Sequence, residues 1–316
     1  PTVYWTYPSD NPATDPNNAL NQDGRSTELP TGFNGSSGLI ETVGGNAIFY
    51  IASENGRIYA LDVEGRGDGT TERIWSWPND YDPTNPVAAR QAPQPGQASS
   101  VTFGSFNGTP ALYVLTGSGW LYVLDAAGTP ANRTTTVLYS RDLVAEPFTT
   151  TPLFDSGVLY VNYVERGTST GRVMAISGTD GSTIWTSAQA FSVFNQSGMV
   201  LVPGAQITGP GPNSGQDALF VGDASGYIAS LDPANGIVRW DTNEITSGVS
   251  GGLGFTYLSV PNNIGTIENL VPSVLIPTNG GALVALNANG ALNSQGTRRI
   301  WQHNLDRGPA TSPATG

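Results

Sequence analysis

Short apolar runs separated by glycine-containing turns recur along the chain. An apolar run at 48–51 is followed by a turn at 54–56, an alternating run at 57–61 and a further run that reaches Trp75. Runs enriched in Val, Ile, Tyr and Thr, with Gly, Asn or Asp between them, are typical of antiparallel hairpins. No stretch keeps a 3.6-residue period over three turns, so the pattern predicts strands rather than helices.

The hairpin pattern is an internal repeat. Five segments align, at 47–77, 111–140, 158–187, 218–242 and 274–304. A weaker apolar run precedes each of them, at 38–43, 99–103, 149–154, 199–202 and 254–259, which makes four strands per unit. Four-stranded units in series form β-propellers. The sequence therefore predicts an all-β fold, a β-propeller with five full blades at 38–78, 98–141, 149–187, 198–242 and 253–304.

Two further runs lie at the ends of the chain. Residues 2–7 resemble the last strand of a unit, and residues 309–316 resemble the first strand of another. Either these edge strands share an incomplete sixth blade, or the chain is a segment of a longer propeller. We favour the second alternative, with residues 1–316 forming a single β-propeller domain.

Each unit carries the same kind of residue at two positions. An Asp or Asn follows the third strand, where its side chain can accept hydrogen bonds from the amides of the turn that it opens. An aromatic residue closes the fourth strand, where it can fill the gap between two twisted sheets. We predict a structural role for Asp62, Asp125, Asp232 and Asn287 (Ser177 in the third unit), and for Trp75, Tyr139, Trp185, Trp240 and Trp301.

These residues carry a resemblance to a known family. The segments 59–62, 122–125 and 228–232 each place an alternating apolar run before the Asp, and the unit resembles the PQQ-like (quinoprotein-type) β-propeller repeat. That family includes alcohol and glucose dehydrogenases that carry pyrroloquinoline quinone. It also includes propellers without a cofactor, such as the lipoprotein of the outer-membrane barrel-assembly machine. The resemblance therefore implies the fold and leaves the activity open.

The amino-acid composition argues against several classes of partner and of catalytic site. Only 12% of the residues are charged, all 13 basic residues are Arg, the net charge is −12, and the 316 residues include no Cys and one His, His303. An acidic chain argues against a nucleic-acid partner. No apolar run is long enough for a membrane helix, so we expect no membrane insertion. The alcohol-oxidising members of the family stack the quinone against a disulfide of adjacent cysteines, so we expect no cofactor and no enzyme activity.

A few local motifs remain as candidate sites. Asp62, Glu64 and Asp68 alternate with glycines, with Glu72 following, and are weak calcium candidates; a turn with solvated acids is the competing interpretation. Residues 66–68 spell Arg-Gly-Asp, and four glycosylation sequons begin at Asn34, Asn107, Asn132 and Asn195. Irregular stretches at 8–37, 78–97, 204–216 and 259–272 are expected to project from a rim of the propeller, where partners bind.

The sequence as a whole favours a non-catalytic, extracytoplasmic module at the cell surface or in an extracellular assembly, from a bacterial source by analogy with the family. Its partners are expected to be proteins or further copies of itself, with a glycan as another option. Two alternatives stay open. One is a fragment of a PQQ-dependent oxidoreductase, and the other is a carbohydrate-binding propeller that uses rim aromatics such as Trp77, Tyr81 and Trp120.

Overall fold

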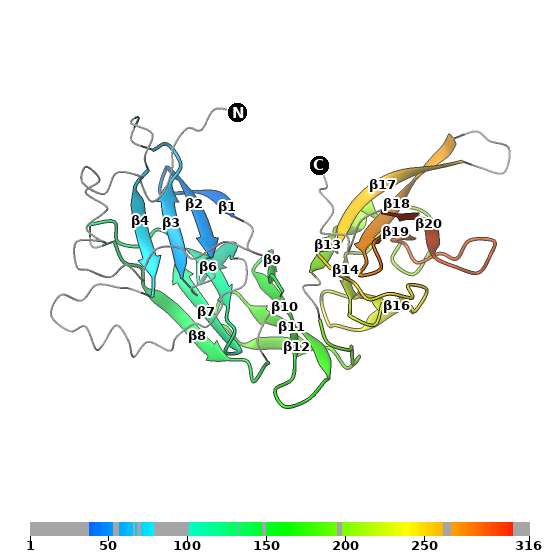
Figure 1. Ribbon diagram of the computed structural model, residues 1–316, viewed down its shortest axis with the longest axis horizontal. Helices are drawn as coiled ribbons and strands as arrows, with labels where there is room; N and C mark the ends of the chain where they lie inside the picture. Colours follow the sequence, from blue (N-terminus) through cyan, green and yellow to red (C-terminus); the bar gives the residue numbers. More distant parts are fainter. Residues whose placement is uncertain are drawn as a thin grey trace. The chain divides into compact units, whose positions relative to one another are not determined.

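Twenty strands in five four-stranded antiparallel sheets make up the described part of the chain, in a computed structural model (Figure 1). The structure describes residues 38–52, 57–65, 67, 71–78, 101–131, 133–146, 150–194, 198–261 and 267–305. The prediction of an all-β fold built from four-stranded units is confirmed. The predicted edge strands at 2–7 and 309–316 lie outside the described residues.

Each sheet is formed by four strands that are consecutive in the chain. Sheet 1 contains β1 (Leu39–Val43), β2 (Asn46–Ala52), β3 (Ile58–Asp62) and β4 (Arg73–Trp77). Sheet 2 contains β5 (Thr102–Phe106), β6 (Thr109–Leu115), β7 (Trp120–Asp125) and β8 (Val137–Asp142). Sheet 3 contains β9 (Leu153–Asp155), β10 (Val158–Val164), β11 (Gly171–Ser177) and β12 (Thr183–Thr186).

The last two sheets follow the same order. Sheet 4 contains β13 (Met199–Val202), β14 (Ala218–Gly222), β15 (Ile228–Leu231) and β16 (Val238–Thr242), with the short 3-10 helix η3 (Gly204–Gln206) between β13 and β14. Sheet 5 contains β17 (Gly254–Pro261), β18 (Ile267–Pro277), β19 (Ala282–Asn287) and β20 (Arg299–Asn304). The expectation of an irregular stretch at 259–272 is wrong, because β17 and β18 extend into it and pair there. Its prolines hid the strands, although each proline removes only one backbone donor.

The strand register shows that the repeat seen in the sequence is also a repeat of the structure. In every sheet the third and fourth strands pair with an irregularity immediately before the repeat Asp, Asn or Ser position, for example between Ala60 and Leu61. A bulge of this kind bends the outer strand and increases its twist. As a result, the closing aromatic pairs with the same position of the third strand each time, as Trp75 does with Ala60 and Trp240 with Ser230.

The chain divides into two compact units, each with its own core. Unit 1 comprises residues 1–148, 154–157 and 178–181, and unit 2 comprises the rest. In unit 1 the side chains between sheets 1 and 2 form one apolar cluster around the fully buried Trp75 and Tyr50. In unit 2 one cluster lies between sheets 3 and 4, and another lies between sheets 4 and 5. Within each unit the core therefore lies in layers between consecutive sheets.

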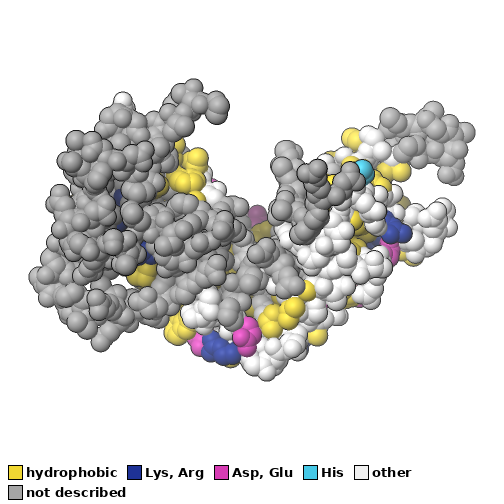
Figure 2. All heavy atoms as spheres, viewed as in Figure 1, with side chains coloured by type: hydrophobic (Ala, Val, Ile, Leu, Met, Phe, Trp, Pro, Cys, Tyr) yellow, Lys and Arg dark blue, Asp and Glu magenta, His cyan; other side chains and the backbone are white. Residues whose placement is uncertain are grey.

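The outer surface matches the low charge of the sequence. On the face shown in Figure 2, the described atoms are mostly uncharged, with scattered hydrophobic side chains and few charged ones. None of the helices among the described residues is long and apolar enough to cross a membrane.

Candidate functional site

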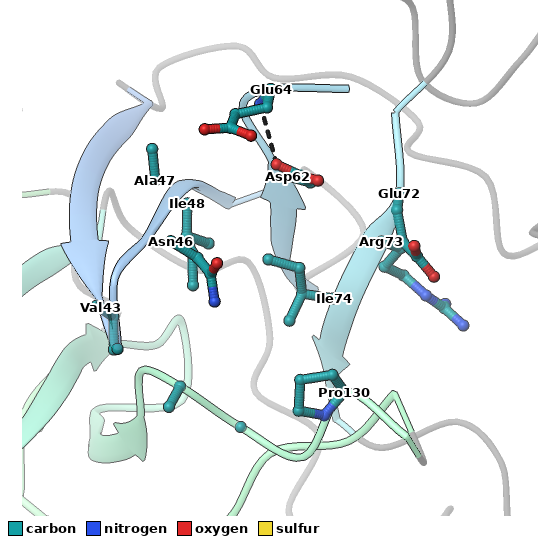
Figure 3. Close-up of a pocket in the computed structure, with 13 residues that line it drawn as sticks. Val43, Asn46, Ala47, Ile48, Asp62, Glu64, Glu72, Arg73, Ile74 and Pro130 are labelled. Carbon is teal, nitrogen blue, oxygen red and sulfur yellow. Dashed lines mark hydrogen bonds between the residues drawn. The ribbon is translucent and has the colours of Figure 1, made fainter. Parts of the chain in front are cut away.

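A pocket of about 370 Å³ lies in unit 1, between sheet 1 and the turn that joins β7 to β8 (Figure 3). Its volume falls at the lower end of the range for small-ligand sites, roughly 300–1,000 Å³. Sheet 1 supplies the β1–β2 turn, the end of β3 and the start of β4, and the β7–β8 turn supplies the facing wall. The lining residues with polar side chains are Asn46, Asp62, Glu64, Glu72 and Arg73.

The pocket contains two of the three calcium candidates. Asp62 and Glu64 line its wall, whereas Asp68 lies outside the described residues. The Asp62 Oδ1 atom accepts the Glu64 backbone N–H at 2.9 Å, and Glu72 Oε1 lies 3.7 Å from the Arg133 guanidinium. In Figure 3 the carboxylates spread along the pocket edge and do not point to one centre. Among the described residues, no three His, Cys or acidic side chains gather as metal ligands, and the calcium site stays a prediction.

The repeat carboxylates and amides belong to turns. Asp62, Asp125, Asp232 and Asn287 each accept the backbone N–H two residues further on, at 2.9, 3.0, 2.9 and 3.2 Å. Burial raises the pKa of Asp232, but the Ala234 N–H and the Arg239 guanidinium, 3.1 Å from Oδ2, outweigh it and hold that pKa below its ordinary value. These side chains therefore stabilise the turn after the third strand by a bond within the same turn.

The closing aromatics reach across to the next sheet. Trp75 Nε1 donates to the Ala126 carbonyl at 2.9 Å, and Trp185 Nε1 donates to the Pro233 carbonyl at 2.9 Å. Tyr139 uses its hydroxyl in the same way, on the Gly181 carbonyl at 3.2 Å, within unit 1. Each acceptor lies in the turn that the next repeat Asp or Ser position opens. Trp301 is half-buried on β20.

Trp240 departs from this pattern. It is buried against the following turn, yet its indole N–H has no hydrogen-bond partner among the described residues. The matching carbonyl, that of Ala288, instead accepts the side-chain amide of Asn213 at 2.8 Å. Asn213 lies in the long β13–β14 loop and is fully buried. Sequence reasoning missed it, because an Asn between Pro and Ser in a glycine-rich loop carries no signal of burial.

The remaining candidates are dispersed. His303 is exposed on β20, and Asn107 is exposed in the β5–β6 turn. Trp120 is half-buried and stacks on Tyr122 with ring centroids 6.0 Å apart. The expectation that Trp77 is an accessible rim aromatic is wrong: it is 2% exposed, because its ring packs into the core against Tyr122. Outside the described residues lie Tyr81, Arg66, Asn34, Asn132 and Asn195.

The pocket lacks the groups that would hold the quinone cofactor of the family that the sequence resembles. A flat quinone needs an aromatic face to stack on, and none of the residues lining the pocket is aromatic. The nearby Trp75 is fully buried beneath Gly128. The residues of this pocket do not fit that cofactor.

Comparisons with known proteins identify a family and similar folds. The family model described as outer membrane protein assembly factor BamB matches residues 54–251. No curated protein sequence matches the chain. Among solved structures, Sqt1 of Saccharomyces cerevisiae is similar at 11% identity with a TM-score of 0.52, covering 82% of this chain and 59% of that one.

Two dehydrogenase structures are also similar. A europium-containing methanol dehydrogenase matches at 15% identity with a TM-score of 0.50, covering 84% of this chain and 52% of that one. A quinohemoprotein alcohol dehydrogenase from Comamonas testosteroni matches at 16% identity with a TM-score of 0.50, covering 85% of this chain and 43% of that one. The chain thus spans 43–59% of the length of these three structures. At such identities the structural likeness shows the fold alone. The family model supplies the rest, and with it the prediction of a PQQ-like propeller is confirmed.

Proposed function

The chain belongs to the family described as outer membrane protein assembly factor BamB, and from this premise we propose that it is a non-catalytic β-propeller module. It acts outside the cytoplasm, as a protein-interaction or structural component of a surface or extracellular assembly. Its partners are proteins, including further copies of itself. Membership of a family described as an assembly factor supports an assembly role in general terms and identifies no partner of this chain.

One observation carries the proposal. The carboxylates and indoles that recur in each repeat form hydrogen bonds that stabilise the turns and hold neighbouring sheets together. Asp62 and Asp232 accept turn amides, while Trp75 and Trp185 donate to carbonyls of the next sheet. A repeat used in this way supports a scaffold, whose variable turns and outer faces are free to bind partners.

The test is an activity assay with a separate association assay. We expect the purified chain, incubated with pyrroloquinoline quinone and Ca²⁺ and then with alcohols, aldoses and a dye acceptor, to show no turnover above the buffer blank. Sustained, quinone-dependent dye reduction would support the oxidoreductase alternative and overturn the proposal. Sedimentation velocity over a range of concentrations, with and without candidate partners, should reveal defined complexes, and a chain that stays monomeric with every candidate would also contradict the proposal.

A further inference from the structure

The pocket in unit 1 corresponds to a site in unit 2 that a loop of the chain occupies. The pairing registers align Trp75 with Trp240 and Ala60 with Ser230. The next sheet aligns in the same way, since Asp125 and Asn287 both open the turn by accepting an amide two residues on. The β7–β8 turn that walls the pocket therefore corresponds to the β19–β20 turn of sheet 5 at 288–290.

In unit 2 the chain fills this position with its own β13–β14 loop. Asn213 donates its side-chain amide to Ser230 Oγ at 2.7 Å and to the Ala288 carbonyl at 2.8 Å. Its backbone N–H donates to the Asn289 carbonyl at 3.2 Å, and Asn289 Nδ2 donates to the Thr208 carbonyl at 3.1 Å. In unit 2 a polypeptide loop with one buried polar tip therefore occupies the site between the two sheets.

Sheet 1 leaves the position open because its first connection is short. β1 and β2 pair up to Val43 and Asn46, so that only Gly44 and Gly45 form the turn, both with positive φ. The corresponding connection in sheet 4 spans residues 203–217. Among the described residues, no connection of comparable length leaves sheet 1 at this point, and the pocket of about 370 Å³ lies there.

Charge distinguishes the open site from the filled one. The open pocket is lined by the carboxylates of Asp62, Glu64 and Glu72 (Figure 3). In sheet 4 the positions that match Glu64 and Glu72 hold Ala234 and Ile237. Of the arginines at the pocket, Arg73 is 6% exposed and donates to Ser76 Oγ at 3.2 Å, and Arg133 lies beside Glu72. The pocket lining therefore carries three carboxylates against the single guanidinium of Arg73, and this excess of negative charge favours a cation.

We propose that this pocket is a docking site for a loop of a partner protein that presents an Arg or Lys side chain at its tip. The inference rests on the proposed interaction function and names its site and the chemistry of the partner segment. The loop lies against the β7–β8 turn as the β13–β14 loop lies against residues 288–290 in unit 2. Its cationic tip meets the carboxylates of the pocket wall, because in unit 1 the Tyr50 hydroxyl and the Trp75 indole already donate to the Ala126 carbonyl, the equivalent of the acceptor of Asn213.

The probe is a cyclic peptide copied from this chain. It has the sequence of residues 207–215, Ile-Thr-Gly-Pro-Gly-Pro-Asn-Ser-Gly, with Arg in place of the Asn at its tip. Two further peptides carry the native Asn or an Asp at that place. Binding is followed by the NMR signal of the Trp75 indole N–H, which lies beneath the pocket and is assigned with Trp75→Phe. We expect the Arg peptide to shift this signal and to bind about tenfold more tightly than the Asp peptide.

Variants of the full chain locate the binding. Asp62→Asn combined with Glu64→Gln keeps the turn acceptor but removes two charges, and should weaken the Arg peptide about tenfold. Ala127→Trp places a bulky side chain on an exposed lining position and should abolish binding. Asp155→Asn is the matched control, because Asp155 is exposed on β9 in the same unit and does not line the pocket. Urea midpoints must show that every variant is folded.

Different results would contradict the docking site and the proposed interaction function. Equal affinity for the Arg and Asp peptides, unchanged binding to the Ala127→Trp variant, or no shift of the Trp75 signal would overturn the docking site. If complexes still form in sedimentation velocity with the Ala127→Trp variant, the interaction function stands while the site falls. Quinone-dependent turnover would overturn the interaction function whatever the peptides do.

Discussion

The contact between sheets 1 and 2 and the contact between sheets 4 and 5 are built on one plan and completed differently. In the first, the indole of Trp75 and the hydroxyl of Tyr50 both donate to the Ala126 carbonyl. In the second, Phe220 replaces the tyrosine and Asn213 takes the carbonyl. In both contacts a buried side chain therefore donates to this carbonyl. The donor comes from the sheets themselves in the first contact and from a long loop in the second.

The largest effect should come from the closing tryptophans themselves. Trp75→Ala and Trp240→Ala each remove a buried indole from between two sheets, at a cost of about 3–5 kcal/mol in the free energy of unfolding. Substitution by phenylalanine should have different costs at the two sites. Trp75→Phe also loses a hydrogen bond and should cost about 1 kcal/mol more than Trp240→Phe, whose N–H has no partner among the described residues. Urea titration measures both, and equal costs for the two phenylalanine variants would break the comparison.

The glycines in contact with the two tryptophans should be the next most sensitive positions. Gly128 has φ +60° and a Cβ there would lie 2.2 Å from Trp75 Cδ1; Gly290 has φ +82° with 2.3 Å to Trp240 Cδ1. Alanine at either place combines a strained backbone with overpacking, for about 2–4 kcal/mol in total.

Gly44 provides the control for this prediction. It has the same φ as Gly128, but a Cβ there meets nothing within 4 Å. Gly44→Ala should therefore cost only the backbone strain, about 1–2 kcal/mol. A cost as large as that of Gly128→Ala would show that contact with the tryptophan contributes nothing.

Removal of the Asn213 amide should free the loop while leaving the sheets intact. Asn213→Ala loses two side-chain hydrogen bonds and leaves the Ser230 hydroxyl and the Ala288 carbonyl without the amide that bridges them, for about 1–3 kcal/mol. Hydrogen exchange should accelerate at Asn213, whose amide bonds to the Asn289 carbonyl, and at Gly215, whose amide bonds to the Ile207 carbonyl of the same loop. It should remain slow in β14 and β15. Unchanged exchange in the loop would contradict the bridging role.

The smallest effect concerns pH. The pKa of Asp232 is lowered in the folded protein, so its charge contributes stability above the unfolded-state value near 3.8 and loses it as the pH falls through the folded-state pKa. Asp232→Asn keeps the turn acceptor, so it should cost up to about 1 kcal/mol at pH 7 and progressively less below about pH 5. In an Arg239→Met background the pH 7 cost should shrink, and a cost that stays constant from pH 7 to pH 3 would disprove the pairing with Arg239.

Most of the fold was predictable from sequence. Period-two runs, glycine turns and a closing aromatic recur five times, and these local signals act within a few residues of one another. The exception was the β17–β18 hairpin, where Pro261 and Pro272 masked strands that pairing with a neighbour stabilises. Of the pocket, the sequence identified Asp62, Glu64 and Glu72 as parts of an acidic cluster but did not place Arg73 or the β7–β8 turn beside them.

By itself, the sequence determined the strands, the four-strand unit and the turn-stabilising role of Asp62 and its equivalents, because each depends on neighbours a few positions away. Only the tertiary structure decided which carbonyl each buried donor reaches and which site between sheets stays open. Asn213 and Ala288 are 75 positions apart, and Trp75 and Ala126 are 51 apart. Such contacts depend on loop length and on the packing of one sheet against the next, which no local pattern encodes.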